Sequence, residues 1–186
     1  MSDDEARPDV PSARMLSWAR NSTIYRLERR MMTERQLFDA IIRKTKQKFE
    51  NITEMQLRAV ADSAVAFAHE NGGLNDTTYA EVSTRSAVRS GRSKRRIAQT
   101  LSQKGVDREI ITAALDEADE LLAAVVFARK RAFGPFRRGD ADRERSAREM
   151  AAFGRNGFSF ETGKTVLSMS HEEAEDLVIA RSRQAR

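Results

Sequence analysis

A corner of three residues occurs twice in this chain, and it constrains the fold more than any other feature. Gly105-Val106-Asp107 and Gly157-Phe158-Ser159 each combine a glycine that ends a helix, an apolar residue that packs back on it, and a side chain that caps the next helix. When the two corners are aligned, Leu101 falls on Phe153, so that a core position meets a core position. The pattern therefore predicts a helical unit that repeats along the chain.

Helix-start signals extend this pattern towards the N-terminus. Thr33-Glu34-Arg35-Gln36 and Thr53-Glu54-Met55-Gln56 are capping boxes, in which a threonine hydroxyl and a glutamine side chain satisfy backbone amides at the start of a helix. The first box also resembles the middle unit, because Leu37 and Ile41 overlay Ile97 and Leu101. The earlier copy is less regular, since Thr45 stands where the glycine is expected.

These signals predict an all-α fold of three degenerate three-helix repeats that form an elongated, curved stack. We expect the boundaries to be a disordered tail at 1–13, repeats at 14–73, 74–120 and 121–168, and a C-terminal helical tail at 169–186. A continuous helix from Asp107 to about Val126 is expected to serve two neighbouring repeats. Apolar spacing further predicts that Trp18, Tyr25, Leu27, Tyr79 and Val82 are core residues.

Composition argues against several functional classes. The chain of 186 residues has no cysteine and 2 histidines, which excludes a disulfide framework and the usual zinc modules. It contains no phosphate-binding glycine loop, and we expect neither a cofactor nor an enzymatic activity. The longest apolar run, 121–128, is far too short to cross a membrane, and the acidic start is unlike a signal peptide, so we expect a cytoplasmic protein.

Basic residues gather in the middle unit, where they are the leading functional signal. Arg85 and Arg89 lie one helical turn apart, and Lys94, Arg95 and Arg96 open the next helix, where positive charge opposes the helix dipole. Arginine forks of this kind can bind phosphates or carboxylates. A solvated helix face explains each residue about as well. The candidate contact residues, which include a second block around Gly134-Pro135, are Arg85, Arg89, Arg92, Lys94, Arg95, Arg96, Lys104, Arg137, Arg138 and Arg148.

Three motifs together resemble the RecX family, bacterial regulators of the RecA recombinase. They are Leu74-Asn75-Asp76 followed by Tyr79-Ala80, the run from Gly91-Arg92-Ser93 to Gly105-Val106, and Arg155-Asn156-Gly157-Phe158 in the last unit. The resemblance covers about 20–168 and is most specific in the middle unit. The chain departs from the family pattern at Asn75 and Asn156, which marks it as a divergent member.

The resemblance implies a small non-enzymatic protein that lies in the groove of the RecA filament on single-stranded DNA. It also implies suppression of the ATPase, recombinase and co-protease activities of that filament, and thereby an effect on DNA repair and the SOS response. We expect a monomer whose partners are the RecA filament and, through it, single-stranded DNA. The alternative from the residues alone is a helix-turn-helix regulator that reads duplex DNA through its basic helix.

Overall fold

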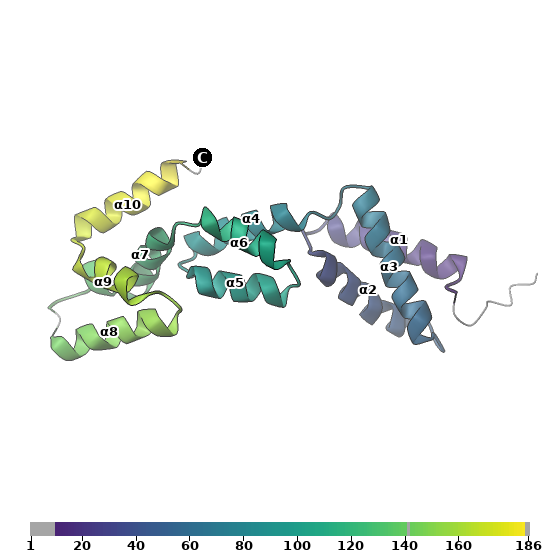
Figure 1. Cartoon of the computed structure of the whole chain (residues 1–186), viewed down its shortest axis with the longest axis horizontal. Coiled ribbons are helices and arrows are strands. Elements are labelled where there is room, and N and C mark those ends of the chain that lie inside the picture. Colours follow the sequence, from purple (N-terminus) through teal and green to yellow (C-terminus); the bar gives the residue numbers. More distant parts are fainter. Residues whose placement is uncertain (1–9, 141, 185–186) are drawn as a thin grey trace, which may run out of the picture. The chain divides into compact units, whose positions relative to one another are not determined.

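The computed structural model describes residues 10–140 and 142–184, and in these residues all regular structure is helical (Figure 1). The helices follow one another in three groups of three, with α10 after them, so the predicted all-α fold of three-helix repeats is confirmed. Their bounds are α1 Ala13–Leu27, α2 Glu34–Lys48, α3 Glu54–Glu70, α4 Asp76–Arg89, α5 Lys94–Gln103, α6 Arg108–Asp116, α7 Glu120–Arg131, the 3-10 turn η1 Gly134–Phe136, α8 Arg143–Arg155, α9 Phe160–Ser168 and α10 His171–Gln184.

The helices begin where their capping residues predict. Thr33 and Thr53 both form complete capping boxes, each hydroxyl accepting a hydrogen bond from the backbone of the glutamine three residues on. Ser12 caps α1 by accepting a hydrogen bond from the Met15 amide at 3.3 Å. Residues 1–9 of the predicted disordered tail lie outside the described residues, and so do 185–186 of the C-terminal tail.

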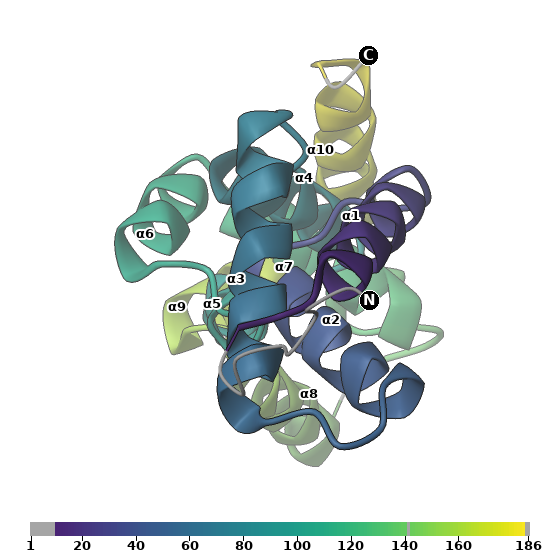
Figure 2. The ribbon, with the colours of Figure 1, turned by 90° about the vertical axis from the view of Figure 1, so that its right-hand side faces the viewer.

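The chain divides into two compact units. The first contains the described residues up to Tyr79 together with Gln103–Asp107. Its helices α1, α2 and α3 lie side by side, with α3 packed against both others (Figure 1, Figure 2). Trp18 and Leu27 pack against the margin of its core. The core itself consists of small and branched apolar residues, which are Ala19, Leu37, Ile41, Val60, Ala61, Ala64, Ala68 and Leu74.

The second unit contains Ala80–Ser102 and the described residues from Arg108 onwards. Its core is aromatic where α7, α8 and α9 meet. The rings of Phe127 and Phe153 lie edge to face with centroids 5.2 Å apart, and the Phe158 ring lies 5.5 Å from Phe127. Phe158 is the apolar residue of the second glycine corner, so this corner is part of the core of its unit.

Three expectations from the sequence are wrong. The helix expected from Asp107 to Val126 is broken after Asp116, because the Asp119 carboxylate accepts a hydrogen bond from the Leu122 amide at 2.9 Å and starts α7 afresh. Tyr25 is 59% exposed and Val82 is 40% exposed, so neither is a core residue. Helical spacing identifies an apolar stripe, but it cannot show where neighbouring helices stop covering that stripe.

Candidate functional site

The start of α5 is held in place by the second glycine corner. Ser93, which is fully buried, accepts a hydrogen bond from the Arg96 amide and donates one to the Asn156 carbonyl at 2.7 Å. Gly157 has a φ of +86°, and a Cβ there would lie 2.7 Å from the Ser93 hydroxyl and 3.3 Å from Arg95 Cβ. The arginines of α5 therefore project from a helix end that is fixed to the end of α8.

The start of α2 meets the first glycine corner in the same way. Thr33, also fully buried, donates a hydrogen bond to the Lys104 carbonyl at 2.6 Å. A Cβ on Gly105 would lie 2.5 Å from Arg35 Cβ. Arg35 thus corresponds to Arg95 in its position over a corner glycine, as their alignment in the sequence suggests.

The arginines at the junction of α4 and α5 are exposed and lack acidic partners. Within the described part of the chain, no ion pair or hydrogen bond engages the guanidinium groups of Arg89, Arg92 and Arg95. Arg85 is also exposed, but it lies 3.9 Å from the Glu81 carboxylate one turn earlier. Such an exposed pair contributes little to stability. The α4–α5 junction therefore presents positive charge that the fold itself leaves unneutralised.

Two other helices of the same unit, α7 and α8, contact this junction. Lys130 of α7 donates a hydrogen bond to the Ser90 carbonyl at 3.0 Å, directly between Arg89 and the turn. Arg96 Nη2 lies 3.5 Å from the Arg155 carbonyl at the end of α8. Sequence reasoning did not include Lys130 among the candidate contact residues, and Arg155 meets the junction through its backbone carbonyl. The position of Arg155 just before the Asn156-Gly157 corner is the sequence signal for that contact.

Arg137, another candidate from the sequence, is engaged inside the fold. Its guanidinium forms a fork on the Glu149 carboxylate, with Nε–Oε1 and Nη2–Oε2 distances of 3.0 and 2.6 Å. The Gly134 amide and Arg145 complete the surroundings of this carboxylate, which is only 3% exposed. Burial alone would raise the pKa of Glu149, but these hydrogen bonds and charges outweigh it and hold that pKa below its ordinary value. Glu149 in turn raises the pKa of Arg137.

The remaining candidates lie in different surroundings. Lys104 is half-buried, and its ammonium donates a hydrogen bond to the Tyr79 hydroxyl at 2.6 Å. Arg148 is exposed and pairs with Glu144 along α8 at 3.5 Å. Arg138 is exposed, and Lys94 is half-buried at the first position of α5. The structure thus gathers Arg89, Arg92, Lys94, Arg95 and Arg96 at one junction, which we call the basic junction.

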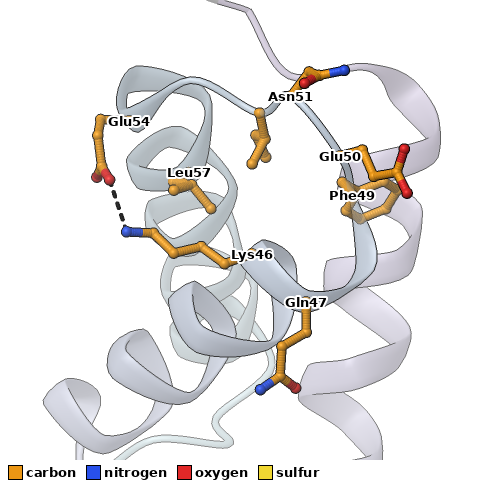
Figure 3. Close-up of a pocket in the computed structure, with 8 residues that line it drawn as sticks. Lys46, Gln47, Phe49, Glu50, Asn51, Glu54 and Leu57 are labelled. Atoms are coloured by element: carbon orange, nitrogen blue, oxygen red, sulfur yellow. Dashed lines mark hydrogen bonds and ion pairs between the residues drawn. The ribbon is translucent and has the colours of Figure 1, made fainter.

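Other kinds of site find little support in the described residues. A shallow pocket of about 440 Å³ lies at the turn between α2 and α3, where Lys46 and Glu54 form an ion pair at 2.7 Å across its rim (Figure 3). Its lining contains no histidine, serine or threonine, and its one lysine is paired with Glu54. In residues 10–140 and 142–184, no acidic or histidine cluster is arranged to hold a metal ion. No helix in this part of the chain is long and apolar enough to span a bilayer.

Comparison with known proteins places the fold and the family. The family model for the second three-helix domain of RecX matches residues 75–115, which include the basic junction. The chain is 57% identical over 176 residues to the regulatory protein RecX of Agrobacterium fabrum, covering 95% of this chain and 96% of that protein. It is 35% identical over 170 residues to the regulatory protein RecX of Myxococcus xanthus, covering 88% and 91%.

A solved structure shares the fold. The crystal structure of RecX from Lactobacillus salivarius superposes with a TM-score of 0.63 at 21% sequence identity, covering 84% of this chain and 96% of that one. Relatives this similar, matched over nearly their whole length, show that the chain belongs to the RecX family of regulatory proteins.

Proposed function

We propose that this protein binds the RecA filament on single-stranded DNA through its basic junction and restrains the ATPase, recombinase and co-protease activities of that filament. The observation that carries the proposal is the set of exposed, unneutralised arginines at 89, 92 and 95, in the segment that matches the RecX domain model. Guanidinium groups form paired hydrogen bonds with carboxylates and phosphates, both of which a nucleoprotein filament offers.

The location of the junction adds support. Lys94, Arg95 and Arg96 occupy the first turn of α5, where the helix dipole disfavours positive charge by a few tenths of a kcal/mol per residue. The three cations remain at this helix start despite the unfavourable dipole. The first turn is fixed by the hydrogen bond from the Ser93 hydroxyl to the Asn156 carbonyl oxygen at 2.7 Å. A fixed cationic helix end suits recognition, because the backbone that carries the side chains does not have to be ordered when a partner binds.

The decisive experiment measures the single-stranded-DNA-dependent ATPase of RecA as this protein is added. We expect the rate to fall as the protein saturates the filament, while the protein alone hydrolyses no ATP. The triple variant Arg89→Gln, Arg92→Gln, Arg95→Gln should require at least tenfold more protein for the same effect. The matched control removes three exposed arginines of the first unit, Arg14, Arg20 and Arg58. An unchanged RecA rate at excess wild-type protein would refute the proposal.

The competing function is sequence-specific binding of duplex DNA, because the same basic helix end could enter the major groove as in a helix-turn-helix protein. The two functions differ in what they require of the DNA. A duplex reader binds one sequence well above others, whereas phosphate contacts alone give binding that is independent of sequence and falls steeply with salt. Selection from a randomised duplex pool therefore separates them, since recovery of a consensus sequence would favour the duplex reader and an unenriched pool would favour the filament ligand.

A further inference from the structure

A second cationic cluster lies in the first unit and contains none of the candidate residues from the sequence. It consists of Arg26 in the last turn of α1, Arg30 in the turn that follows this helix, and Arg43 on α2. Arg26 is half-buried, and its Nε is shielded from solvent and has no hydrogen-bond partner among the described residues. A buried donor without an acceptor is rare in folded proteins.

The charges around Arg26 are of the same sign. Burial, then the charge of Arg43 and then that of Arg30 lower the pKa of Arg26, and the described residues supply no carboxylate that offsets them. Cations at the end of α1 do favour the helix dipole, which accounts for Arg26 and Arg30. The dipole does not account for Arg43, which comes from another helix and adds a third like charge to the cluster.

An exposed tyrosine lies on the adjacent face of the same helix end. Tyr25 is 59% exposed, and Arg29 stacks on its ring at 4.8 Å from the centroid while also hydrogen-bonding to its hydroxyl. Ile24, next to it in the chain, and Met31, after the end of the helix, are 43% and 49% exposed. The Arg29 and Arg30 amides both donate to the Arg26 carbonyl at 3.2 Å, so the arginines are held in one tight turn.

From this arrangement we propose a second binding site, in which Arg26, Arg30 and Arg43 hold a phosphate of a single-stranded nucleic acid and Tyr25 stacks on one of its bases. A phosphate supplies the negative charge that the three arginines lack. An exposed aromatic ring beside cationic side chains is the combination that binds unpaired strands, because every base has a face that can stack. This site lies in the first unit, is distinct from the basic junction, and does not depend on RecA.

The test is direct binding of a fluorescent oligothymidine to the full chain, measured by polarisation at several salt concentrations without RecA. Each of Arg30→Gln and Arg43→Gln should weaken binding about three- to tenfold. Each should also make the slope of log affinity against log salt shallower by roughly 0.7, as expected for one lost phosphate contact. Arg43→Gln should not lower thermal stability, because it removes a like charge from beside Arg26, and in Arg30→Gln the same relief offsets the lost interaction with the helix dipole. Arg58→Gln, an exposed arginine on α3, is the matched control and should leave the affinity unchanged.

Stacking has its own test. Tyr25→Ala should weaken binding at least fivefold, whereas Tyr25→Phe should retain most of the affinity because it keeps the ring. A duplex of the same length should bind more weakly than the single strand. Equal binding of strand and duplex, or displacement of the strand by inorganic phosphate at matched ionic strength, would overturn the assignment to an unpaired strand.

The outcome separates this site from the proposed function. If Arg30→Gln and Arg43→Gln bind the oligonucleotide like wild type, the second site is refuted, even if RecA inhibition is intact. If those variants bind the oligonucleotide normally but no longer inhibit RecA, the cluster contacts an acidic protein surface and the nucleic-acid assignment fails. If the wild type leaves RecA unaffected while the variants lose oligonucleotide binding, the proposed function fails and this site stands.

Discussion

The two glycine corners share one hydrogen-bond arrangement but differ in how closely other atoms approach the glycine. At each corner a buried hydroxyl at the start of a helix donates to the carbonyl before a glycine, from Thr33 to Lys104 at 2.6 Å and from Ser93 to Asn156 at 2.7 Å. The space above the glycine differs. A Cβ on Gly105 would meet Arg35 at 2.4 Å, whereas a Cβ on Gly157 would first meet a serine hydroxyl at 2.7 Å.

This difference shows which parts of the corner are required and which can vary. The cap, the carbonyl and the left-handed glycine are kept in both corners, so they set how one helix start meets another helix end. The corners differ in whether the arginine that covers the glycine has an acidic neighbour. Arg35 lies 3.9 Å from Asp39 one turn on, whereas Arg95 has Gln99 at that position and no acidic partner among the described residues. The same corner thus serves packing in one unit and exposes free charge in the other.

Replacement of the corner glycines should have the largest effect. Gly105→Ala should lower the free energy of unfolding by about 3–4 kcal/mol, from left-handed strain and overlap with Arg35. Gly157→Ala should cost about 2–3 kcal/mol, because its neighbour there is a smaller group. Urea unfolding of the full chain measures both. Gly72→Ala and Gly139→Ala are matched controls, since both glycines have positive φ and open space around them, and each should cost only about 1 kcal/mol. Equal losses at all four positions would show that the packing above the glycine is irrelevant.

One carboxylate in each unit should make a contribution to stability that depends on pH, and the two contributions should have opposite directions. Glu149→Gln leaves Arg137 without its partner and should cost about 3 kcal/mol at neutral pH. The pKa of Glu149 is held below its ordinary value, so its stabilising contribution is present above the ordinary carboxyl pKa and is lost as pH falls through the lower folded value. The cost of the variant should therefore shrink at low pH.

Asp76 in the first unit is the contrasting case. Burial raises its pKa, with the Glu34 charge adding to the effect, although a hydrogen bond from the Glu34 amide and the charge of His69 partly oppose it. Its contribution is thus greatest below the ordinary carboxyl pKa and is lost as pH rises through the folded value. The stability of Asp76→Asn relative to wild type should increase with pH, opposite to that of Glu149→Gln. Unfolding curves between pH 3 and about 7 measure both slopes, and slopes of the same sign would contradict this assignment.

Loss of the corner hydroxyls should have a somewhat smaller effect. Thr33→Val and Ser93→Ala each remove a helix cap and leave the carbonyl of a half-buried residue without its donor, which should cost about 2 kcal/mol. Thr33→Ser keeps the hydroxyl and should cost less than half as much. Because the two hydroxyls make equivalent bonds, the losses at Thr33 and Ser93 should agree within about 0.5 kcal/mol. A clear difference in urea unfolding would mean that the corners are alike in geometry but not in energy.

Local sequence patterns predicted these corners better than they predicted the surroundings of the charged residues. Caps and helix-ending glycines act over three or four residues, so Thr33, Gly105 and Gly157 could be recognised directly. The bonds that join each cap to a distant carbonyl connect residues 71 and 63 positions apart, and nothing local indicates them. The same holds for the Arg137 fork on Glu149, because a buried ion pair and a free arginine look identical in sequence.

Replacement of the two arginines that cover the corner glycines should have the smallest effect on stability. These variants distinguish a role in packing from a role in binding the partner. Arg35→Gln and Arg95→Gln both keep a side-chain stem over the corner glycine, so each should change unfolding by less than about 0.5 kcal/mol. Only Arg95→Gln should weaken inhibition of the RecA ATPase, because the charge of Arg35 already has Asp39 beside it. Gln99→Asp tests the reason directly, since it gives Arg95 the acidic neighbour that Arg35 has. It should reproduce the loss caused by Arg95→Gln without removing an arginine, whereas Asp39→Gln should leave inhibition unchanged. Equal losses from the two arginine variants would mean that the corner itself, and not its free charge, meets the partner.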